Sequence, residues 1–220
     1  MATVAIYAMP GTGVTVLLCA LVAVASYLLG CFNGAVIVSK YILRDDVRNH
    51  GSGNAGLTNF HRTFGGRLTA IVILTDALKA VLAVLIGGWL MSGVAAGGVL
   101  LGKYWAALWC LLGHMFPAIF GFRGGKGILS GGTIAIMLDW RVALVVWGGF
   151  FVLVLLTRYV SLGSVYAGAS FPVATWAVFG QPVLVGFACL LGGLVIFMHR
   201  ANIRRLLQGN ESKFSFHKKK

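Results

Sequence analysis

The chain has 220 residues, of which 59% are hydrophobic and only 10% are charged, and its mean hydropathy is +0.90. This composition excludes a soluble domain, and the apolar runs lack the alternation of a β-barrel. The formal charge of +13 is attributed to membrane topology and attraction to anionic lipids, and nucleic-acid binding is disfavoured because no soluble domain would present the charge.

Long uncharged runs predict an all-α polytopic membrane protein. No charged residue precedes Lys40, and none lies between Arg158 and Arg200. Because one crossing needs about 20 residues, the second run is long enough for two helices, separated at the turn 180–182. We expect seven transmembrane helices, at residues 14–39, 68–90, 96–113, 126–138, 142–157, 163–179 and 183–199. The fourth and fifth are short for a full crossing.

The first predicted span has no basic region before it, and it is too long for the core of a signal peptide. We therefore expect it to stay uncleaved. Residues 1–210 are expected to form one membrane-embedded domain, followed by a basic tail at 211–220. The cysteines lie in apolar segments without metal-ligand spacing, so we expect core packing and not disulfides for Cys19, Cys31, Cys110 and Cys189.

Most basic residues fall on one side of the predicted membrane. If every segment crosses, the loops after the odd-numbered spans share a side with the C-terminus. That side carries Lys40, Arg44, Arg48, Arg62, Arg67, Arg123, Lys126, Arg158, Arg200, Arg204, Arg205, Lys213, Lys218, Lys219 and Lys220. The opposite loops hold Arg141, next to Asp139. The positive-inside rule then predicts an external N-terminus and a cytoplasmic C-terminus.

Four polar segments fall on the predicted cytoplasmic side. The first is GSGNAGLTNFHR, residues 51–62. Its glycines let backbone amides turn toward a ligand, and Arg62 supplies a forked cation suited to phosphate. Its short polar side chains are Ser52, Asn54, Thr58 and Asn59. A string of this composition is also common in ordinary loops.

The second polar segment is GHMFPAIFGFRGGKG, residues 113–127, which leads directly into the fourth span. The start of a helix offers unpaired amides and a positive dipole end, so it suits an anion. Gly127 follows Lys126 where a nucleotide-binding P-loop needs Ser or Thr, so nucleotide hydrolysis is disfavoured. Glycine packing at a helix end is the alternative interpretation.

The third polar segment, residues 158–164, lies at the start of the sixth span, and the fourth, residues 199–211, follows the seventh. Ser161 would cap a helix, and Ser164, one turn further on, would face a site. His199 and Asn202 are three residues apart and share a helix face, although the arginines beside them also suit lipid headgroups.

Two ionisable features lie within the spans. Asp76 and Lys79 are at positions i and i+3, and we expect them to neutralise each other, with an intramembrane functional pair as the alternative. His114 either caps the third span or belongs to a site, and both interpretations stay open.

Two basic, glycine-rich loops on one side indicate two phosphate groups, or one phosphate contacted twice. Their place at the membrane surface indicates an amphiphilic ligand. The acidic residues of that side, Asp45, Asp46 and Glu211, are too few for a two-metal phosphotransferase. We predict group transfer without metal or cofactor, in which positioning and electrostatics act on a substrate hydroxyl.

Together with HRANIRRLLQGNE, residues 199–211, the first two segments resemble the three motifs of the bacterial acyl-phosphate:glycerol-3-phosphate acyltransferases. The likeness covers residues 14–211. It implies transfer of a fatty acyl group from acyl phosphate to the 1-hydroxyl of sn-glycerol 3-phosphate, giving lysophosphatidic acid and inorganic phosphate. This is the first step of phospholipid synthesis. It also implies seven helices in the bacterial cytoplasmic membrane, an active site facing the cytoplasm and no obligate protein partner.

The resemblance also implies roles for individual residues. The catalytic residues would be Ser52, Arg62, Lys126, His199 and Asn202. Glycerol 3-phosphate would be held by Ser52, Arg62, Lys126, Ser164 and His199. Acyl phosphate would be held by Asn54, Thr58, Asn59, Gly124, Gly125, Gly127 and Ser130, while Glu211 would be structural. The chain departs from the motifs at Leu57 and at residues 128–130, where Ser130 still provides a hydroxyl.

The base that takes the hydroxyl proton is either His199 or a phosphate oxygen of the substrate. The substrate is favoured, since no carboxylate is evidently placed to orient His199. A transporter of a phosphorylated metabolite is one alternative function, but it predicts polar residues deep in the spans. An acyltransferase using acyl-CoA or acyl-carrier protein is another. Such enzymes commonly carry a His-x-x-x-x-Asp pair, which is missing at His50, His61, His114 and His199.

Overall fold

A computed structural model describes residues 11–94 and 96–214, which form a helical bundle without strands in these ranges. The α-helices are α1 (Thr12–Cys31), α2 (Gly34–Ile37), α3 (Leu57–Thr63), α4 (Leu68–Leu90), α5 (Gly98–Met115), α6 (Ile128–Leu138), α7 (Trp140–Thr157), α8 (Val160–Phe179), α9 (Pro182–Met198) and α10 (Arg200–Leu207). Short turns are the π-helical η1 (Val38–Ile42) and the 3-10 turns η2 (Val47–Asn49) and η3 (Ala118–Phe120).

Five helices among the described residues are long and apolar enough to cross a membrane: α1, α4, α5, α7 and α8. A sixth crossing results if α9 and α10, bent by 59° at their junction, count as one span. Helix α6 has 11 residues, so it is about 16 Å long and covers about half of a hydrocarbon core. The predicted seven full spans are therefore confirmed only in part, although α4 matches its predicted bounds at both ends.

The first span is shorter than predicted because Asn33 turns the chain. Its buried side chain accepts a hydrogen bond from Val36 N, which caps α2, and donates to Ala55 O at 3.0 Å. Helix α1 therefore ends at Cys31, and residues 34–42 form separate short helices. Since Ala55 belongs to the first polar segment, the same side chain ties that segment to the bundle.

Polar contacts also define the C-terminal end of α6. Lys103, from α5, donates to the carbonyl of Met137 at 3.2 Å, in the last turn of α6. Asp139 then caps α7 by accepting from Arg141 N at 2.8 Å. A cation at a helix C-terminus and a carboxylate at the next N-terminus both favour a break at this point.

Glycines allow close helix crossings. A Cβ on Gly102 would lie 2.2 Å from the carbonyl oxygen of Gly87, and a Cβ on Gly87 would lie 2.5 Å from that of Gly102, so α4 and α5 meet backbone to backbone. Helices α8 and α9 meet in the same way at Gly168 and Gly192. Small residues are the usual means of close approach between helices in a membrane.

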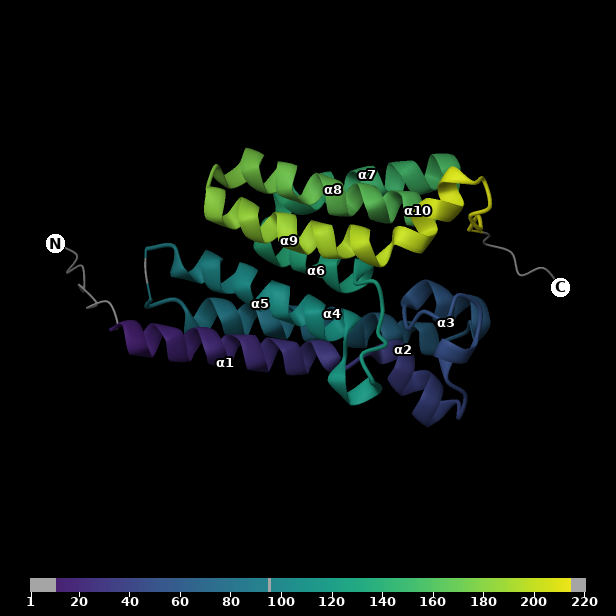
Figure 1. Cartoon of the computed structure of the whole chain (residues 1–220), viewed down its shortest axis with the longest axis horizontal. Coiled ribbons are helices and arrows are strands. Elements are labelled where there is room, and N and C mark those ends of the chain that lie inside the picture. Colours follow the sequence, from purple (N-terminus) through teal and green to yellow (C-terminus); the bar gives the residue numbers. More distant parts are fainter. Residues whose placement is uncertain (1–10, 95, 215–220) are drawn as a thin grey trace.

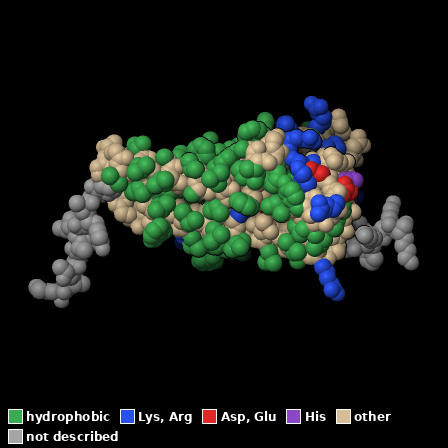
Figure 2. Space-filling model, turned by 90° about the horizontal axis from the view of Figure 1, so that it is seen from below, with side chains coloured by type: hydrophobic (Ala, Val, Ile, Leu, Met, Phe, Trp, Pro, Cys, Tyr) green, Lys and Arg blue, Asp and Glu red, His purple; other side chains and the backbone are tan. Residues whose placement is uncertain are grey.

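The polar segments gather at one end of the bundle. Figure 1 shows α1 beginning at the opposite end, while α3, the start of α6 and α10 lie together. On the face seen in Figure 2, hydrophobic side chains cover the middle of the molecule and most Lys and Arg side chains gather at the end with α10. All four cysteines are free thiols, as predicted. Core packing is confirmed for Cys31 and Cys110, which are buried, but it is wrong for Cys189, which is exposed on α9. Residues 215–220, which include Lys218–Lys220 of the predicted tail, lie outside the described ranges.

Candidate active site

A cavity of about 780 Å³ opens at the basic end of the bundle. Residues from all four polar segments line it, although they are far apart in the chain. The predicted site residues that it brings together are Ser52, Asn54, Thr58, Asn59, Arg62, Lys126, Gly127, Ser164, His199, Asn202 and Glu211. Gly124, Gly125 and Ser130 are not in its wall.

The loop before α3 is organised by Asn59, which is buried. Its Nδ2 lies 3.0–3.1 Å from the carbonyl oxygens of Val47, His50 and Asn54. Its Oδ1 accepts from Ser52 N at 3.1 Å. Because its hydrogen-bonding capacity is used within the loop, Asn59 fixes the position of Ser52 and does not offer its amide to a ligand.

Arg62 lies on α3 and faces the cavity. Its side chain is exposed, and within residues 11–94 and 96–214 it forms no ion pair or hydrogen bond. The planar fork of the guanidinium is therefore free to take a phosphate with two parallel hydrogen bonds.

The glycines of the second segment support the cavity from behind. Gly124 N donates to Met115 O and Gly125 N donates to His114 O, both at 3.1 Å, so these amides are not available to a ligand. A Cβ on Gly124 would lie 2.0 Å from the carbonyl oxygen of His114, so a larger residue would not fit here without a shift of the backbone.

The part of this segment that is suited to an anion lies one step further on, at the start of α6. Gly127 has a positive φ of 79° and turns the chain into the helix, whose first amides have no partner within the helix. Gly127, Ile128 and Leu129 line the cavity together with Lys126. Ser130, in contrast, is buried and donates its hydroxyl to the carbonyl of Asp76 at 3.1 Å.

Polar contacts connect Lys126 to α10 and the segment that follows it. The ammonium of Lys126 donates to Oδ1 of Asn202, whose Nδ2 donates to Glu211 at 2.7 Å. The other oxygen of Glu211 accepts from Arg205 Nε at 2.7 Å. Burial alone would raise the pKa of Glu211, but the hydrogen bonds from Asn202 and Arg205 keep it below its usual value. Glu211 is thus an ionised hydrogen-bond partner that holds the amide of Asn202 in place.

Burial, and after it the positive charge of Arg205, lowers the pKa of Lys126 to about 8. The free protein therefore carries the Lys126 ammonium below pH 8 and loses it above, when phosphate binding weakens. We expect kcat/KM to fall with rising pH above about 8, approaching about tenfold per unit, because kcat/KM reports the pKa values of the free enzyme. Lys126→Arg, which stays charged, should abolish this alkaline limb whatever its absolute rate. An unchanged limb in the variant would assign it to another group.

His199 lies at the bend between α9 and α10 and is buried. Its Nδ1 lies 2.8 Å from the carbonyl oxygen of Val195, which can only accept, so the ring proton belongs on Nδ1. Nε2 of the neutral ring is left as a proton acceptor in a residue that lines the cavity. Ser164 donates its hydroxyl to Val160 O at 2.8 Å and keeps its lone pairs for a ligand.

Three buried ionisable residues lie at the inner end of the cavity, two of them in its wall and Lys79 behind it. Lys79 Nζ is 2.7 Å from Oδ1 of Asp76, as expected from their spacing, and it also lies 2.7 Å from Nδ1 of His114. A third bond goes to Phe32 O at 2.9 Å. Asp76 and His114 line the cavity, so the Asp76–Lys79 pair borders the site and is not isolated in lipid. The sequence alone left open whether this pair is only neutralised or has a function.

One wall of the cavity, which the sequence analysis missed, is aromatic. Trp147, Phe150 and Phe151 all come from α7, and their rings are in mutual contact, with centroids 5.2–5.3 Å apart. Their i, i+3, i+4 spacing places them on one helix face and was a signal for such a wall. Phe151 is 53% exposed, so the wall continues from the cavity to the lipid-facing surface.

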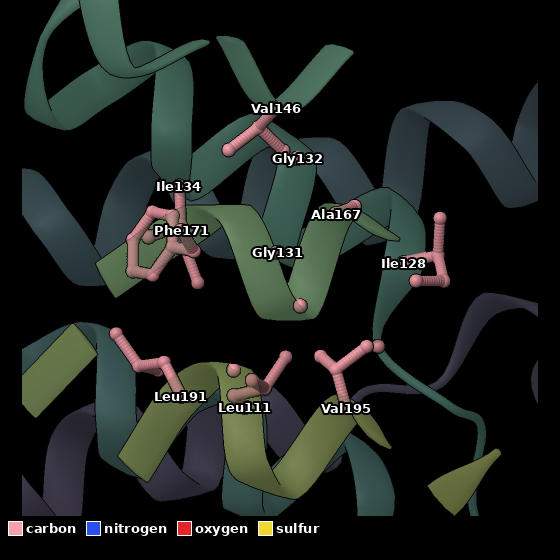
Figure 3. Close-up of a pocket in the computed structure, with 13 residues that line it drawn as sticks. Leu111, Ile128, Gly131, Gly132, Ile134, Val146, Ala167, Phe171, Leu191 and Val195 are labelled. Carbon is pink, nitrogen blue, oxygen red and sulfur yellow. The ribbon is translucent and has the colours of Figure 1, made fainter. Parts of the chain in front are cut away.

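A second cavity of about 40 Å³ lies between the helices and is lined by apolar residues. Figure 3 shows Phe171, Leu191 and Val195 among the side chains around it, with Gly131 and Gly132 on α6. It shares Gly127 and Ile128 with the large cavity. Its volume is about that of one or two water molecules, so it is a packing void next to the site and not room for a whole ligand.

This is a multi-pass helical protein whose cavity has cations on one wall and an aromatic path to lipid on another. Such a cavity suits a phosphorylated amphiphile at the membrane surface. The chain belongs to the glycerol-3-phosphate acyltransferase family, because the sequence model of that family matches residues 20–209. A glycerol-3-phosphate acyltransferase of Thermoanaerobacter pseudethanolicus is 39% identical over 193 residues, covering 88% of this chain and 94% of the relative.

Two solved structures are also similar. Both are crystal structures of PlsY (YgiH), an integral membrane glycerol 3-phosphate acyltransferase. The glycerol 3-phosphate form has a TM-score of 0.80 at 32% identity, covering 90% of this chain and 96% of the other. The lysophosphatidic acid form has a TM-score of 0.77 at 31% identity, covering 90% and 95%. Membership confirms the resemblance found in the three motifs.

Proposed function

We propose that the protein transfers a fatty acyl group from acyl phosphate to the 1-hydroxyl of sn-glycerol 3-phosphate. The reaction takes place at the cytoplasmic face of the bacterial inner membrane and releases lysophosphatidic acid and inorganic phosphate. Similar proteins have been solved in glycerol 3-phosphate and lysophosphatidic acid forms, which are the acceptor and the product of such a transfer. The accumulation of basic residues at the site's end of the bundle supports a cytoplasmic active site.

The placement of Arg62 and Lys126 around one cavity is the observation that carries this proposal. The two cations come from different segments, so they suit two phosphate-bearing substrates bound together. Arg62, with the fork that phosphate prefers, holds glycerol 3-phosphate together with Ser52 and Ser164. The first amides of α6 hold the phosphate of the acyl phosphate, and Lys126 contacts both.

The aromatic wall gives the acyl chain a route. Trp147 and Phe150 border the cavity, and Phe151 reaches the lipid-facing surface of α7. A fatty chain lying along these rings keeps its apolar surface away from water while its phosphate meets the start of α6. The substrate can thus enter sideways from the bilayer.

The 1-hydroxyl oxygen attacks the acyl carbonyl carbon, and the bond from that carbon to the phosphate oxygen breaks. An acyl phosphate is already activated, so no acyl-enzyme is needed. The hydroxyl proton goes to a phosphate oxygen of glycerol 3-phosphate or to Nε2 of His199. His199 is oriented by the carbonyl of Val195 and not by a carboxylate, which keeps the substrate phosphate the favoured base.

Donor specificity tests this function. The purified protein is given glycerol 3-phosphate with palmitoyl phosphate, palmitoyl-CoA or palmitoyl-acyl carrier protein, and lysophosphatidic acid and inorganic phosphate are measured. We expect product and an equal amount of phosphate with the acyl phosphate alone. Product only with a thioester would overturn the choice of donor, and uptake of glycerol 3-phosphate into vesicles without phosphate release would indicate a transporter.

A further inference from the structure

His114 belongs to the cavity wall but has no role in the reaction as described above. It lies in the last turn of α5 and is only 3% exposed. Lys79 and Asp76 hold it from behind, with Lys79 Nζ 2.7 Å and Asp76 Oδ1 3.7 Å from its Nδ1. A buried polar cluster of this kind fixes the orientation of a side chain that borders a site.

The contact with Lys79 determines which ring nitrogen carries the proton. An ammonium group has three donors and no acceptor, and Lys79 directs its donors to Asp76, Phe32 O and Nδ1 of His114. Nδ1 must therefore accept, and the proton of the neutral ring lies on Nε2. His199 has the opposite tautomer, so the cavity has one imidazole that donates and one that accepts.

Nε2 of His114 is directed at the second polar segment. A Cβ built on Gly125 would lie 2.2 Å from this atom, so only glycine leaves room for it. Within residues 11–94 and 96–214, the ring of His114 has a hydrogen-bond contact at Nδ1 and none at Nε2. An N–H donor is thus held beside Gly125 and Lys126, next to the start of α6, in a residue that lines the cavity.

We propose that His114 is a further catalytic residue, whose Nε2–H donates to the acyl carbonyl oxygen as that oxygen becomes an oxyanion. This inference rests on the proposed function. The cluster of Asp76, Lys79 and neutral His114 has no net charge, whereas the phosphates have Arg62, Lys126 and the start of α6. A neutral, fixed donor suits a group whose charge appears only in the transition state. His114 keeps its proton throughout, and the leaving phosphate takes the electrons of the broken C–O bond.

Two variants of similar polarity separate this role from a structural one. In His114→Asn the amide reaches the position of Nδ1, so it can keep the contact with Lys79 but has no donor at Nε2. In His114→Gln the amide nitrogen reaches the position of Nε2. We expect kcat to fall about 100-fold in His114→Asn, with both KM values within about threefold of wild type. His114→Gln should stay within about tenfold of the wild-type kcat.

Equal losses in the two variants, or a loss confined to the KM for acyl phosphate, would overturn the proposal. Nitrogen-15 NMR of the histidine rings in the wild-type protein gives an independent test that needs no variant to fold. It should show a proton on Nε2 of His114, and a proton on Nδ1 would contradict the assignment. A wild-type protein inactive with acyl phosphate would instead contradict the proposed function itself.

Discussion

Arg62→Ala is expected to lower kcat/KM for glycerol 3-phosphate by about 10²- to 10³-fold. The guanidinium faces the cavity without a protein partner, so its hydrogen-bonding capacity is free for the phosphate. Two charge-assisted hydrogen bonds contribute about 3–4 kcal/mol in total, and about 1.4 kcal/mol corresponds to a factor of ten. Arg62→Lys keeps the charge but loses the fork, so it should recover only part of the loss. Steady-state release of phosphate with each substrate varied in turn measures both effects.

Arg67→Ala is the matched control for this experiment. Arg67 is also an exposed arginine, five residues further on, but it lies at the start of α4 and does not line the cavity. Its removal lowers the net charge by the same amount and should leave kcat/KM nearly unchanged. Similar losses in the two variants would mean that Arg62 acts through the overall positive potential and not through direct contact.

Asp76→Asn is expected to destabilise the protein by about 3–5 kcal/mol, the usual cost of leaving one member of a buried ion pair alone. Asp76 and Lys79 are 1% and 3% exposed, and their charges are 2.7 Å apart. For a chain of this size the loss corresponds to a Tm lower by roughly 10 °C. Thermal unfolding of the detergent-solubilised protein, followed by cysteine reactivity or circular dichroism, measures it.

The double variant Asp76→Asn/Lys79→Met tests the reason for that loss. It removes both charges, keeps an acceptor for Gly34 N and retains the volume of the side chains, so most of the stability should return. Activity should stay low, because His114 loses the ammonium that holds its tautomer. Asp139→Asn, in an ion pair at the opposite end of the bundle, should change Tm little. Full activity in the double variant would show that the pair serves only the fold.

The sequence was sufficient for features that depend on local composition. Helix α4 begins and ends where predicted, because a polar segment with Arg67 precedes it and its sequence is apolar apart from the paired Asp76 and Lys79. The first span was predicted too long for the same reason. Residues 32–39 are mostly apolar, and the sign of a turn is the pair Asn33-Gly34. The partner of the Asn33 side chain, Ala55, lies 22 residues away.

The sequence also predicted some parts of the site and missed others. The motifs and their positions between spans predicted that one side of the membrane holds Arg62, Lys126, His199 and Asn202. The structure places these four residues around one cavity. The motif could not reveal that the amides of Gly124 and Gly125 are already bonded to the carbonyls of Met115 and His114. Glycine supplies a turn in either case, so the pattern is the same whether its amide faces a ligand or the protein.

The sequence by itself determined that this is a helical membrane protein, with the residues proposed to bind phosphate on one side of the membrane and in three recognisable motifs. Hydropathy and charge are sufficient for this, because the bilayer imposes them on each segment separately. Only the tertiary structure revealed that Asp76, Lys79 and His114 form one buried cluster at the cavity. Lys79 and His114 are 35 residues apart, and their contact depends on α4 and α5 packing backbone to backbone at glycines. The direction of an N–H donor follows from that packing, which no local pattern encodes.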